Sequence, residues 1–190
     1  MHDATKRPER GDSGRGATSP RTDLPALGTV HLADEHDVAR FCCAKSERVQ
    51  KFLRDDARRY VEKGYANVYV WPDPADPCHV MGYYTLSASN VAKEHLANRH
   101  ERKAEKGIPV PVALIGYMGK TDGAPQGFGG VLIVDAAIRV AQDTGGIAAW
   151  GLALEPENDQ LVAWYEKQNF TRAKNRPGFM YGSLQDFLPK

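Results

Sequence analysis

The sequence predicts a single domain of the α/β class. Strand-like runs, in which apolar residues are continuous or alternate, are separated by helix-like runs. The chain is also long enough to form one such domain, because 190 residues with 42% hydrophobic content can bury one ordinary core. Finally, a glycine-rich turn at residues 126–130 stands between a strand-like and a helix-like run.

The first half of the chain is predicted to contain three short strands and two helical regions. We expect its strands at residues 30–32, 66–71 and 79–87. We expect its helices within residues 34–63, which hold two, and at residues 91–106. Pro72, Pro74 and Pro77 end the second strand, because proline has no N–H for a ladder hydrogen bond.

In the second half of the chain, predicted strands and helices alternate more regularly. A buried strand at residues 112–119 precedes the glycine-rich turn, and a helix at residues 129–143 follows it. Another strand is expected at residues 147–154 and the last helix at residues 159–168. Two strands close the sheet, at residues 170–173 and 179–184.

The first 24 residues differ from the rest, because charged, small and proline residues dominate them. We therefore expect a disordered polar tail at residues 1–24 and one folded domain at residues 25–190. No apolar segment follows the basic residues of the tail, and none approaches the ~20 residues of a membrane helix. These features predict a soluble, cytoplasmic protein.

The cysteines indicate reduced thiols. Cys42, Cys43 and Cys78 are odd in number, and adjacent cysteines rarely bridge each other. No partners stand at metal-ligand spacing, so no metal site is predicted.

A net charge of +1 gives no general indication of nucleic-acid binding, but the basic residues form two groups. In the helical stretch 45–59, steps of three or four residues put Lys51, Arg54 and Arg58 on one face. The second group comprises Lys93, Arg99, Arg102, Lys103 and Lys106. Acidic residues are mixed into both groups, so a solvated charged face explains them as well as phosphate contacts do.

The turn at residues 126–130 opens a helix. Such a turn aims free backbone N–H groups at one point, and the helix dipole adds partial positive charge, which suits phosphate. Glycine clusters are more often plain turns, so this feature alone is weak evidence for a phosphate site.

Together with Asn158 and Tyr165 in the stretch 158–170, the strand, turn and helix resemble the GNAT N-acetyltransferases. The resemblance implies the GNAT fold, with a mixed, mostly antiparallel central sheet that is splayed at the acetyl-CoA site and flanked by helices. Upstream features resemble the TacT-type toxins of bacterial toxin–antitoxin pairs, which acetylate the amino group of aminoacyl-tRNA. They are Phe41-Cys42, Phe52-Leu53-Arg54 with Ala57, the run Met-Gly-Tyr-Tyr-Thr-Leu-Ser at 81–87, and Pro109-Val110-Pro111.

The resemblance implies acetyl-CoA as co-substrate, no metal, and a site where the sheet splays between the strands at 112–119 and 147–154. The turn holds the pyrophosphate, and backbone groups near Met118 and Gly119 meet the pantetheine arm and the oxyanion. The implied cofactor-binding residues are Met118, Gly119, Lys120, Gln126, Gly127, Phe128, Gly129, Gly130 and Asn158. As a plain alternative, Asn158 caps the last helix.

Tyr165 matches the family's tyrosine that protonates the departing thiol. A phenol pKa of about 10 against a thiol pKa of about 8.5 makes full proton transfer slightly uphill, so the hydroxyl also serves as a hydrogen-bond donor to sulfur. Without the motif, a tyrosine beside Trp164 in an amphipathic helix would be an ordinary half-buried core residue. Its spacing from Asn158 and Phe170 favours the catalytic role.

The phosphate turn departs from the family pattern, which reads Gln or Arg, two residues, Gly, one residue, and Gly or Ala. If Gly127 and Gly129 fill the glycine positions, the leading position falls on Ala124, followed by a proline. A frame that starts at Gln126 restores the glutamine but puts a valine at the last small position. We prefer the first frame because it keeps the helix register.

No general base is evident, and this bears on the acceptor. At pH 7.5 a lysine amine is neutral in only about one part in a thousand, whereas an α-amine is neutral in roughly a third. An α-amino acceptor therefore needs little help beyond water. Glu155 and Glu157 remain possible bases, which leaves lysine acceptors open.

Three functions stay open from the sequence. The first is a toxin that acetylates aminoacyl-tRNA, as a monomer or a homodimer, and is inhibited by a ribbon-helix-helix antitoxin whose tail covers the CoA site. For it, the resemblance implies tRNA contacts at Arg54, Arg58, Lys93, Arg99, Arg102 and Lys103. The second is an acetyltransferase for a small-molecule or protein amine. The third, suggested by Ala124-Pro125, is a GNAT-like binding module without catalysis.

Overall fold

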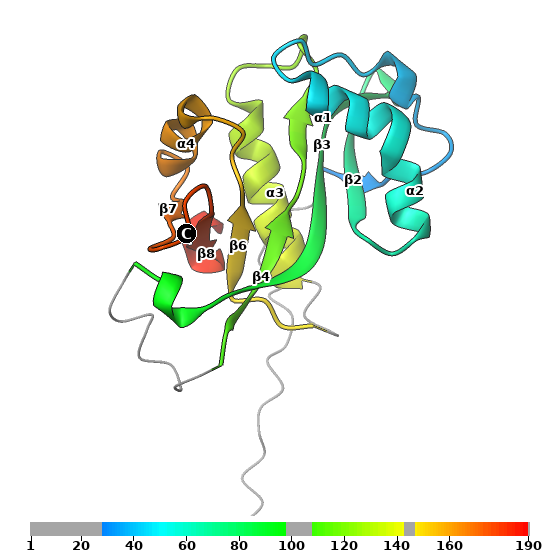
Figure 1. Ribbon diagram of the computed structural model, residues 1–190. Helices are drawn as coiled ribbons and strands as arrows, with labels where there is room; N and C mark the ends of the chain where they lie inside the picture. Colours follow the sequence, from blue (N-terminus) through cyan, green and yellow to red (C-terminus); the bar gives the residue numbers. More distant parts are fainter. Residues whose placement is uncertain (1–27, 98–107, 143–146, 190) are drawn as a thin grey trace, which may run out of the picture.

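The computed structural model describes residues 28–97, 108–142 and 147–189. They form an open sheet with helices packed against both faces (Figure 1). In this part of the chain, no helix is long and apolar enough to cross a membrane. The tail predicted at residues 1–24 lies outside the described residues and stays a prediction.

The described strands form an eight-stranded sheet in the order β1-β2-β3-β4-β6-β8-β7, with β5 paired to β3. The strands are β1 (Val30–His31), β2 (Asn67–Asp73), β3 (Asp76–Val91), β4 (Val110–Ile115), β5 (Met118–Lys120), β6 (Gly151–Leu154), β7 (Thr171–Arg172) and β8 (Met180–Ser183). The pair β4–β6 is parallel, and the other strand pairs are antiparallel. The mixed, mostly antiparallel sheet is thus confirmed.

The two helices predicted within residues 34–63 are present and join end to end. Ser46 caps α1 (Glu47–Lys51) by accepting a hydrogen bond from the Val49 N–H at 3.3 Å. A π-helical turn, Phe52–Asp56, links α1 to α2 (Ala57–Glu62), and a short 3₁₀ helix, Val38–Arg40, precedes them. The other helices are α3 (Phe128–Gln142), α4 (Asp159–Glu166) and α5 (Leu184–Phe187).

Alternation along β2 and β3 divides the core between the two faces of the sheet. Val68, Val70 and Tyr83 belong to the cluster beneath α1 and α2. Tyr69 and Tyr84 point to the opposite face and pack in the cluster around α3. Adjacent residues of one strand therefore anchor helices on opposite sides of the sheet.

A buried polar network fixes the start of the described chain against α3. The Asp135 carboxylate accepts hydrogen bonds from the Gly28 N–H at 2.7 Å, from the Tyr84 hydroxyl at 2.6 Å and from the Thr29 hydroxyl. Arg139, one turn further along α3, donates to the Thr29 carbonyl at 2.6 Å. Buried polar groups are costly unless paired, so this network favours one placement of β1.

Three predictions for this part of the sheet are wrong because strand pairing overrides the local pattern. The strand predicted at residues 79–87 is longer, since residues 87–91 of β3 pair with β4. The helix predicted at residues 91–106 is replaced, over its described part, by the end of β3 and a 3₁₀ turn, Lys93–His95; residues 98–107 lie outside the description. Pro72 does not end β2, because the register shifts there and a ladder N–H is not required.

The strand predicted at residues 112–119 is divided into β4 and β5. The Thr85 N–H donates to the Tyr117 carbonyl at 2.9 Å, and the Tyr117 N–H donates to the Thr85 hydroxyl at 3.0 Å. These bonds carry the chain from β4, beside β6, to β5, beside β3. The strand predicted at residues 147–154 is shorter than expected, and α5 follows the helix predicted to be last.

Candidate active site

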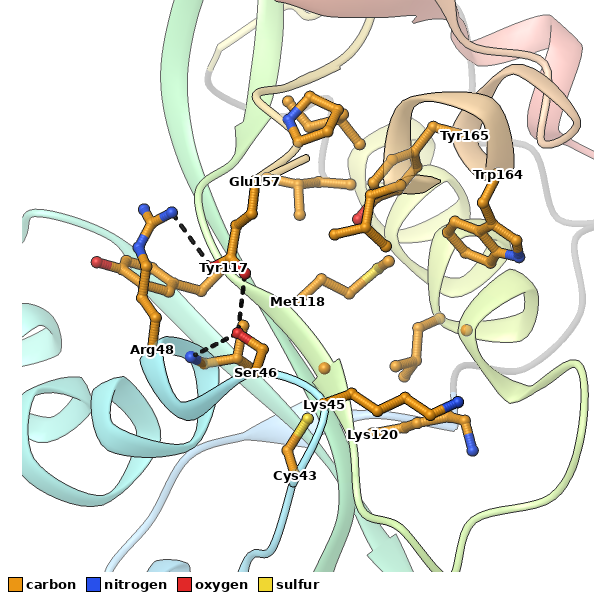
Figure 2. A pocket seen from close by; sticks show the side chains of 18 of the residues that line it. Cys43, Lys45, Ser46, Arg48, Tyr117, Met118, Lys120, Glu157, Trp164 and Tyr165 are labelled. Carbon is orange, nitrogen blue, oxygen red and sulfur yellow. Dashed lines mark hydrogen bonds and ion pairs between the residues drawn. The ribbon is translucent and has the colours of Figure 1, made fainter. Parts of the chain in front are cut away.

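A cavity of about 480 Å³ opens where β4 and β6 separate. The two strands pair in parallel from Val112 with Gly151 to Ile115 with Leu154, and beyond this point the chain turns away to β5. One edge of β5 therefore has no partner strand in the described part of the chain. The sheet is splayed at the predicted place. Figure 2 shows the side chains that surround the opening.

Tyr165 points from α4 into this cavity (Figure 2). Its side chain is 8% exposed, and its ring packs edge-on against Trp164 and Phe170. Among the described residues, no group forms a hydrogen bond with its hydroxyl. Burial and, secondarily, the charge of Glu157 raise the pKa of Tyr165 above its usual value. The phenol therefore keeps its proton at neutral pH and is available as a donor.

The glycine-rich turn forms another part of the cavity wall. Gly127 has a φ of +83°, in the left-handed region that favours glycine, and α3 begins at the next residue. A helix that begins directly after Gly127 agrees with the alignment of the glycine pattern that starts at Ala124. The Gly130 N–H bonds to the Gly127 carbonyl at 2.9 Å, whereas the N–H groups of Gly127 and Gly129 have no backbone acceptor within the described residues. Two donors are thus available at the start of α3.

The predicted cofactor-binding residues divide into two sets. Those on the cavity wall are Met118, Gly119, Lys120, Gly127, Gly129 and Asn158. Gln126, Phe128 and Gly130 do not line it, and Phe128 packs instead against the core ring of Trp71. Asn158 also caps α4, because its side chain accepts from the Leu161 N–H at 3.0 Å.

The wall formed by β5 depends on two close contacts. A Cβ atom on Gly119 would lie 2.3 Å from Cγ1 of Val49, so only glycine lets α1 approach the strand this closely. The Lys120 ammonium donates to the Ala124 carbonyl at 2.9 Å and braces the turn before α3. Gly119 and Lys120 of β5 therefore position two neighbouring elements of the site.

Glu157 connects the loop after β6 to the start of α1. Its carboxylate accepts from the Ser46 hydroxyl at 3.0 Å and forms an ion pair with Arg48 at 3.3 Å (Figure 2). Glu155, the other predicted base, is more exposed and pairs with Arg176 at 2.9 Å. Both line the cavity, but only Glu157 acts on the pKa of Tyr165. Of these two carboxylates, Glu157 is therefore the one whose charge influences the Tyr165 phenol.

None of the described residues predicted to contact tRNA lines this cavity. Arg54 donates to the Phe41 carbonyl at 2.9 Å. Arg58 donates to the carbonyls of Ala33 and His36 at 3.1 and 3.0 Å, so both arginines hold the segment before α1. Lys93 lies in the 3₁₀ turn after β3. The remaining predicted contacts, Arg99, Arg102 and Lys103, lie outside the described residues.

Sequence reasoning missed the wall that the start of α1 and the β4–β5 link contribute. Its side chains include Cys43, Lys45, Ser46, Arg48 and Tyr117. The cap pattern at Ser46 was a usable signal for a helix start. The contact between Ser46 and Glu157 spans 111 positions, and no local pattern indicates such a pairing.

No family model matches this sequence. Solved structures do share its fold. AtaT complexed with acetyl-methionyl-tRNAfMet has a TM-score of 0.75 at 21% identity, over 84% of this chain and 96% of AtaT. A tyrosine-to-phenylalanine mutant of KacT has a TM-score of 0.72 at 21% identity, over 85% of this chain and 96% of KacT. AtaTR bound with AcCoA has a TM-score of 0.69 at 21% identity, over 85% of this chain and 95% of that chain.

At this identity the likeness establishes the fold alone. It is the GNAT fold, which AtaT and KacT share, and the splayed sheet, the turn before α3 and the cavity are its observable features here.

Proposed function

We propose that this protein is an acetyl-CoA-dependent N-acetyltransferase, and that it is a toxin which acetylates the amino group of aminoacyl-tRNA and so blocks translation. The observation that carries the proposal is the Tyr165 side chain, which points into a cavity between a splayed sheet and a helix start. The structural neighbours support it, because AtaT was solved with acetyl-methionyl-tRNAfMet and AtaTR with AcCoA.

The chemistry of the cavity wall fits acetyl-CoA. The available N–H groups of Gly127 and Gly129, together with the dipole of α3, suit a pyrophosphate. The unpaired edge of β5 at Met118 and Gly119 suits the amide groups of a pantetheine arm. Acetyl-CoA supplies an activated acetyl thioester to this site, and the proposal requires no metal.

In this mechanism Tyr165 acts on the sulfur that leaves. Its hydroxyl donates a hydrogen bond or a proton to that atom, and the raised pKa keeps the donor protonated. Glu157, fixed by Ser46 and Arg48, faces the same cavity, and either its carboxylate or water takes the proton that the attacking amine loses. An α-amine suits this arrangement, because roughly a third of it is already neutral at pH 7.5.

The proposal includes a partner. We infer a ribbon-helix-helix antitoxin whose tail covers the CoA cavity, and a homodimer is compatible with it. AtaT has been solved with the C-terminus of the antitoxin AtaR, which supports inhibition of this fold by a peptide tail. We place the action of the toxin in the cytoplasm, where aminoacyl-tRNA is used.

A second function, acetylation of a small-molecule or protein amine, is favoured by one observation. Arg54 and Arg58 are engaged with backbone carbonyls, so the first basic group offers fewer free cations to a tRNA than the sequence indicated. The third possibility, a non-catalytic module, requires that the cavity bind acetyl-CoA without turnover.

The test is transfer of radiolabelled acetyl groups to total charged tRNA. Label that stays with the RNA, and that mild base releases as N-acetyl amino acid, supports the toxin function. Deacylated tRNA is the matched control and should accept no label. Transfer only to free amines or proteins would establish the second function. Binding of acetyl-CoA in calorimetric titration without CoA release with any acceptor would establish the third.

A further inference from the structure

A column of stacked side chains runs from the core of the protein to the rim of the cavity. The buried Tyr83 ring is stacked on Phe52, with 6.3 Å between ring centroids and 14° between planes. Phe52 is stacked on Tyr117 at 3.7 Å and 9°. The guanidinium of Arg48 lies over Tyr117, 5.0 Å from the ring centroid, and ends the column.

The column is held at both ends. The Tyr83 hydroxyl donates to the Val49 carbonyl of α1 at 2.6 Å, which fixes the innermost ring. At the outer end, Nη1 of Arg48 forms its ion pair with Glu157 at 3.3 Å. Because Glu157 also accepts from Ser46, the carboxylate itself has a defined position. The guanidinium is thus held from one side by an ion pair and from below by an aromatic ring.

The other face of the guanidinium is available. The Arg48 side chain is 59% exposed, although one face of its guanidinium lies over the Tyr117 ring. Arg48 and Tyr117 separate the main cavity from a neighbouring hollow of about 360 Å³, which Lys51 also lines. A planar, positively charged surface therefore lies at the border between the two cavities.

Such a surface recognises one class of group best. An arginine plane that already rests on an aromatic ring stacks on planar, π-rich rings, and nucleobases are the usual partners in RNA binding. In an aminoacyl-tRNA, the acceptor amine and the terminal base are joined through a single ribose. A base that belongs to the acceptor must therefore lie next to the cavity in which the amine reacts.

We propose that Arg48, presented by the Tyr83–Phe52–Tyr117 column, stacks on the terminal nucleobase of the RNA acceptor. This contact makes Arg48 a specificity-determining residue. This inference rests on the proposed function. It adds a subsite for the base in the hollow that Lys51 lines together with Glu47 and Asp56, and it assigns the adjoining backbone phosphate to Lys51.

The test separates stacking from general charge by removing the base. Charged tRNA is prepared with its normal 3′-terminal adenosine or with an abasic ribose at that position, each carrying an aminoacyl group that the parent acetylates in the pool assay. The value of kcat/KM is measured for both acceptors with the parent, Arg48→Ala and Arg48→Lys. Arg59→Ala is the matched control, because Arg59 also lies over a tyrosine, Tyr60, but lines neither cavity.

The parent should prefer the acceptor with the base by roughly fivefold to a hundredfold, the range expected for one stacked base. Arg48→Ala should lose this preference, and Arg48→Lys should lose most of it because lysine keeps the charge without the plane. Arg59→Ala should keep it. A parent that uses both acceptors equally, or an Arg48→Ala enzyme that keeps the preference, overturns the subsite while the toxin function stands. A parent that acetylates no charged tRNA overturns both.

Discussion

Replacing Tyr165 with phenylalanine tests the proposed chemistry most directly, because it removes one oxygen from a site that is otherwise unchanged. The ring stays packed against Trp164 and Phe170. Since no described group bonds to the hydroxyl, its loss should change the free energy of unfolding by less than about 1 kcal/mol. The melting temperature should then move by less than about 4 °C. The affinity for acetyl-CoA should be kept, because the proposed phosphate donors lie at the start of α3 and not on α4.

Turnover should fall far more. A positioned acid contributes typically 10²–10⁴-fold, so kcat should drop by about that factor, equivalent to about 3–5 kcal/mol of transition-state stabilisation. The assay is release of free CoA thiol with a fixed charged-tRNA acceptor, together with calorimetric titration of acetyl-CoA. Tyr60→Phe, which removes a hydroxyl outside the cavity, is the matched control. A Tyr165→Phe enzyme with the kcat of the parent would refute the assignment.

Four further outcomes are expected. The rate should rise with pH as the acceptor amine loses its proton, with a midpoint at about 7.7–8.0, and should show no fall up to about pH 9, because the phenol stays protonated below its raised pKa. A pH–rate profile, corrected for base hydrolysis of the aminoacyl ester, checks this. Gly127→Val should weaken acetyl-CoA binding in calorimetry, since φ is +83° there and the turn must change to accept a side chain. Asp135→Asn should cost about 1–3 kcal/mol and lower the melting temperature by roughly 2–12 °C, whereas the exposed Asp34→Asn should cost less than about 1 kcal/mol. Charge reversal at Arg102 with Lys103 should weaken tRNA binding and its salt dependence in filter assays, while leaving acetyl-CoA affinity intact.

The parts of the fold that were predictable are those determined by neighbouring residues. The glycine at position 127, the apolar periodicity of α3 and the cap at Asn158 are local signals, and each element lies within a few residues of its predicted place. The expected helix at residues 91–106 failed for the opposite reason. Residues 87–91 join the sheet because β4, some 20 positions away, supplies their hydrogen-bond partners.

In the candidate site, too, the features that local sequence signals determine were predictable, and those that depend on distant segments were not. Tyr165 and the turn before α3 were found through a motif, and the structure places them on one cavity. Arg54 and Arg58 were grouped correctly on one helical stretch, but helical periodicity does not say what that face contacts. Their partners, among them the Phe41 carbonyl, come from the irregular segment before α1. Irregular backbone has no period from which its position could be predicted.

One backbone step produces both the donor cavity and the proposed base subsite. Gly116 and Tyr117 lie where the chain leaves β4, and the buried Thr85 fixes that step by bonding both the carbonyl and the N–H of Tyr117. The step turns β5 away from β6, which opens the cavity that Tyr165 faces. It also directs the Tyr117 ring onto Phe52, where it supports Arg48. Because the same two hydrogen bonds position both features, we expect the proposed sites for the acetyl donor and for the acceptor base to be coupled through a threonine that lines neither cavity.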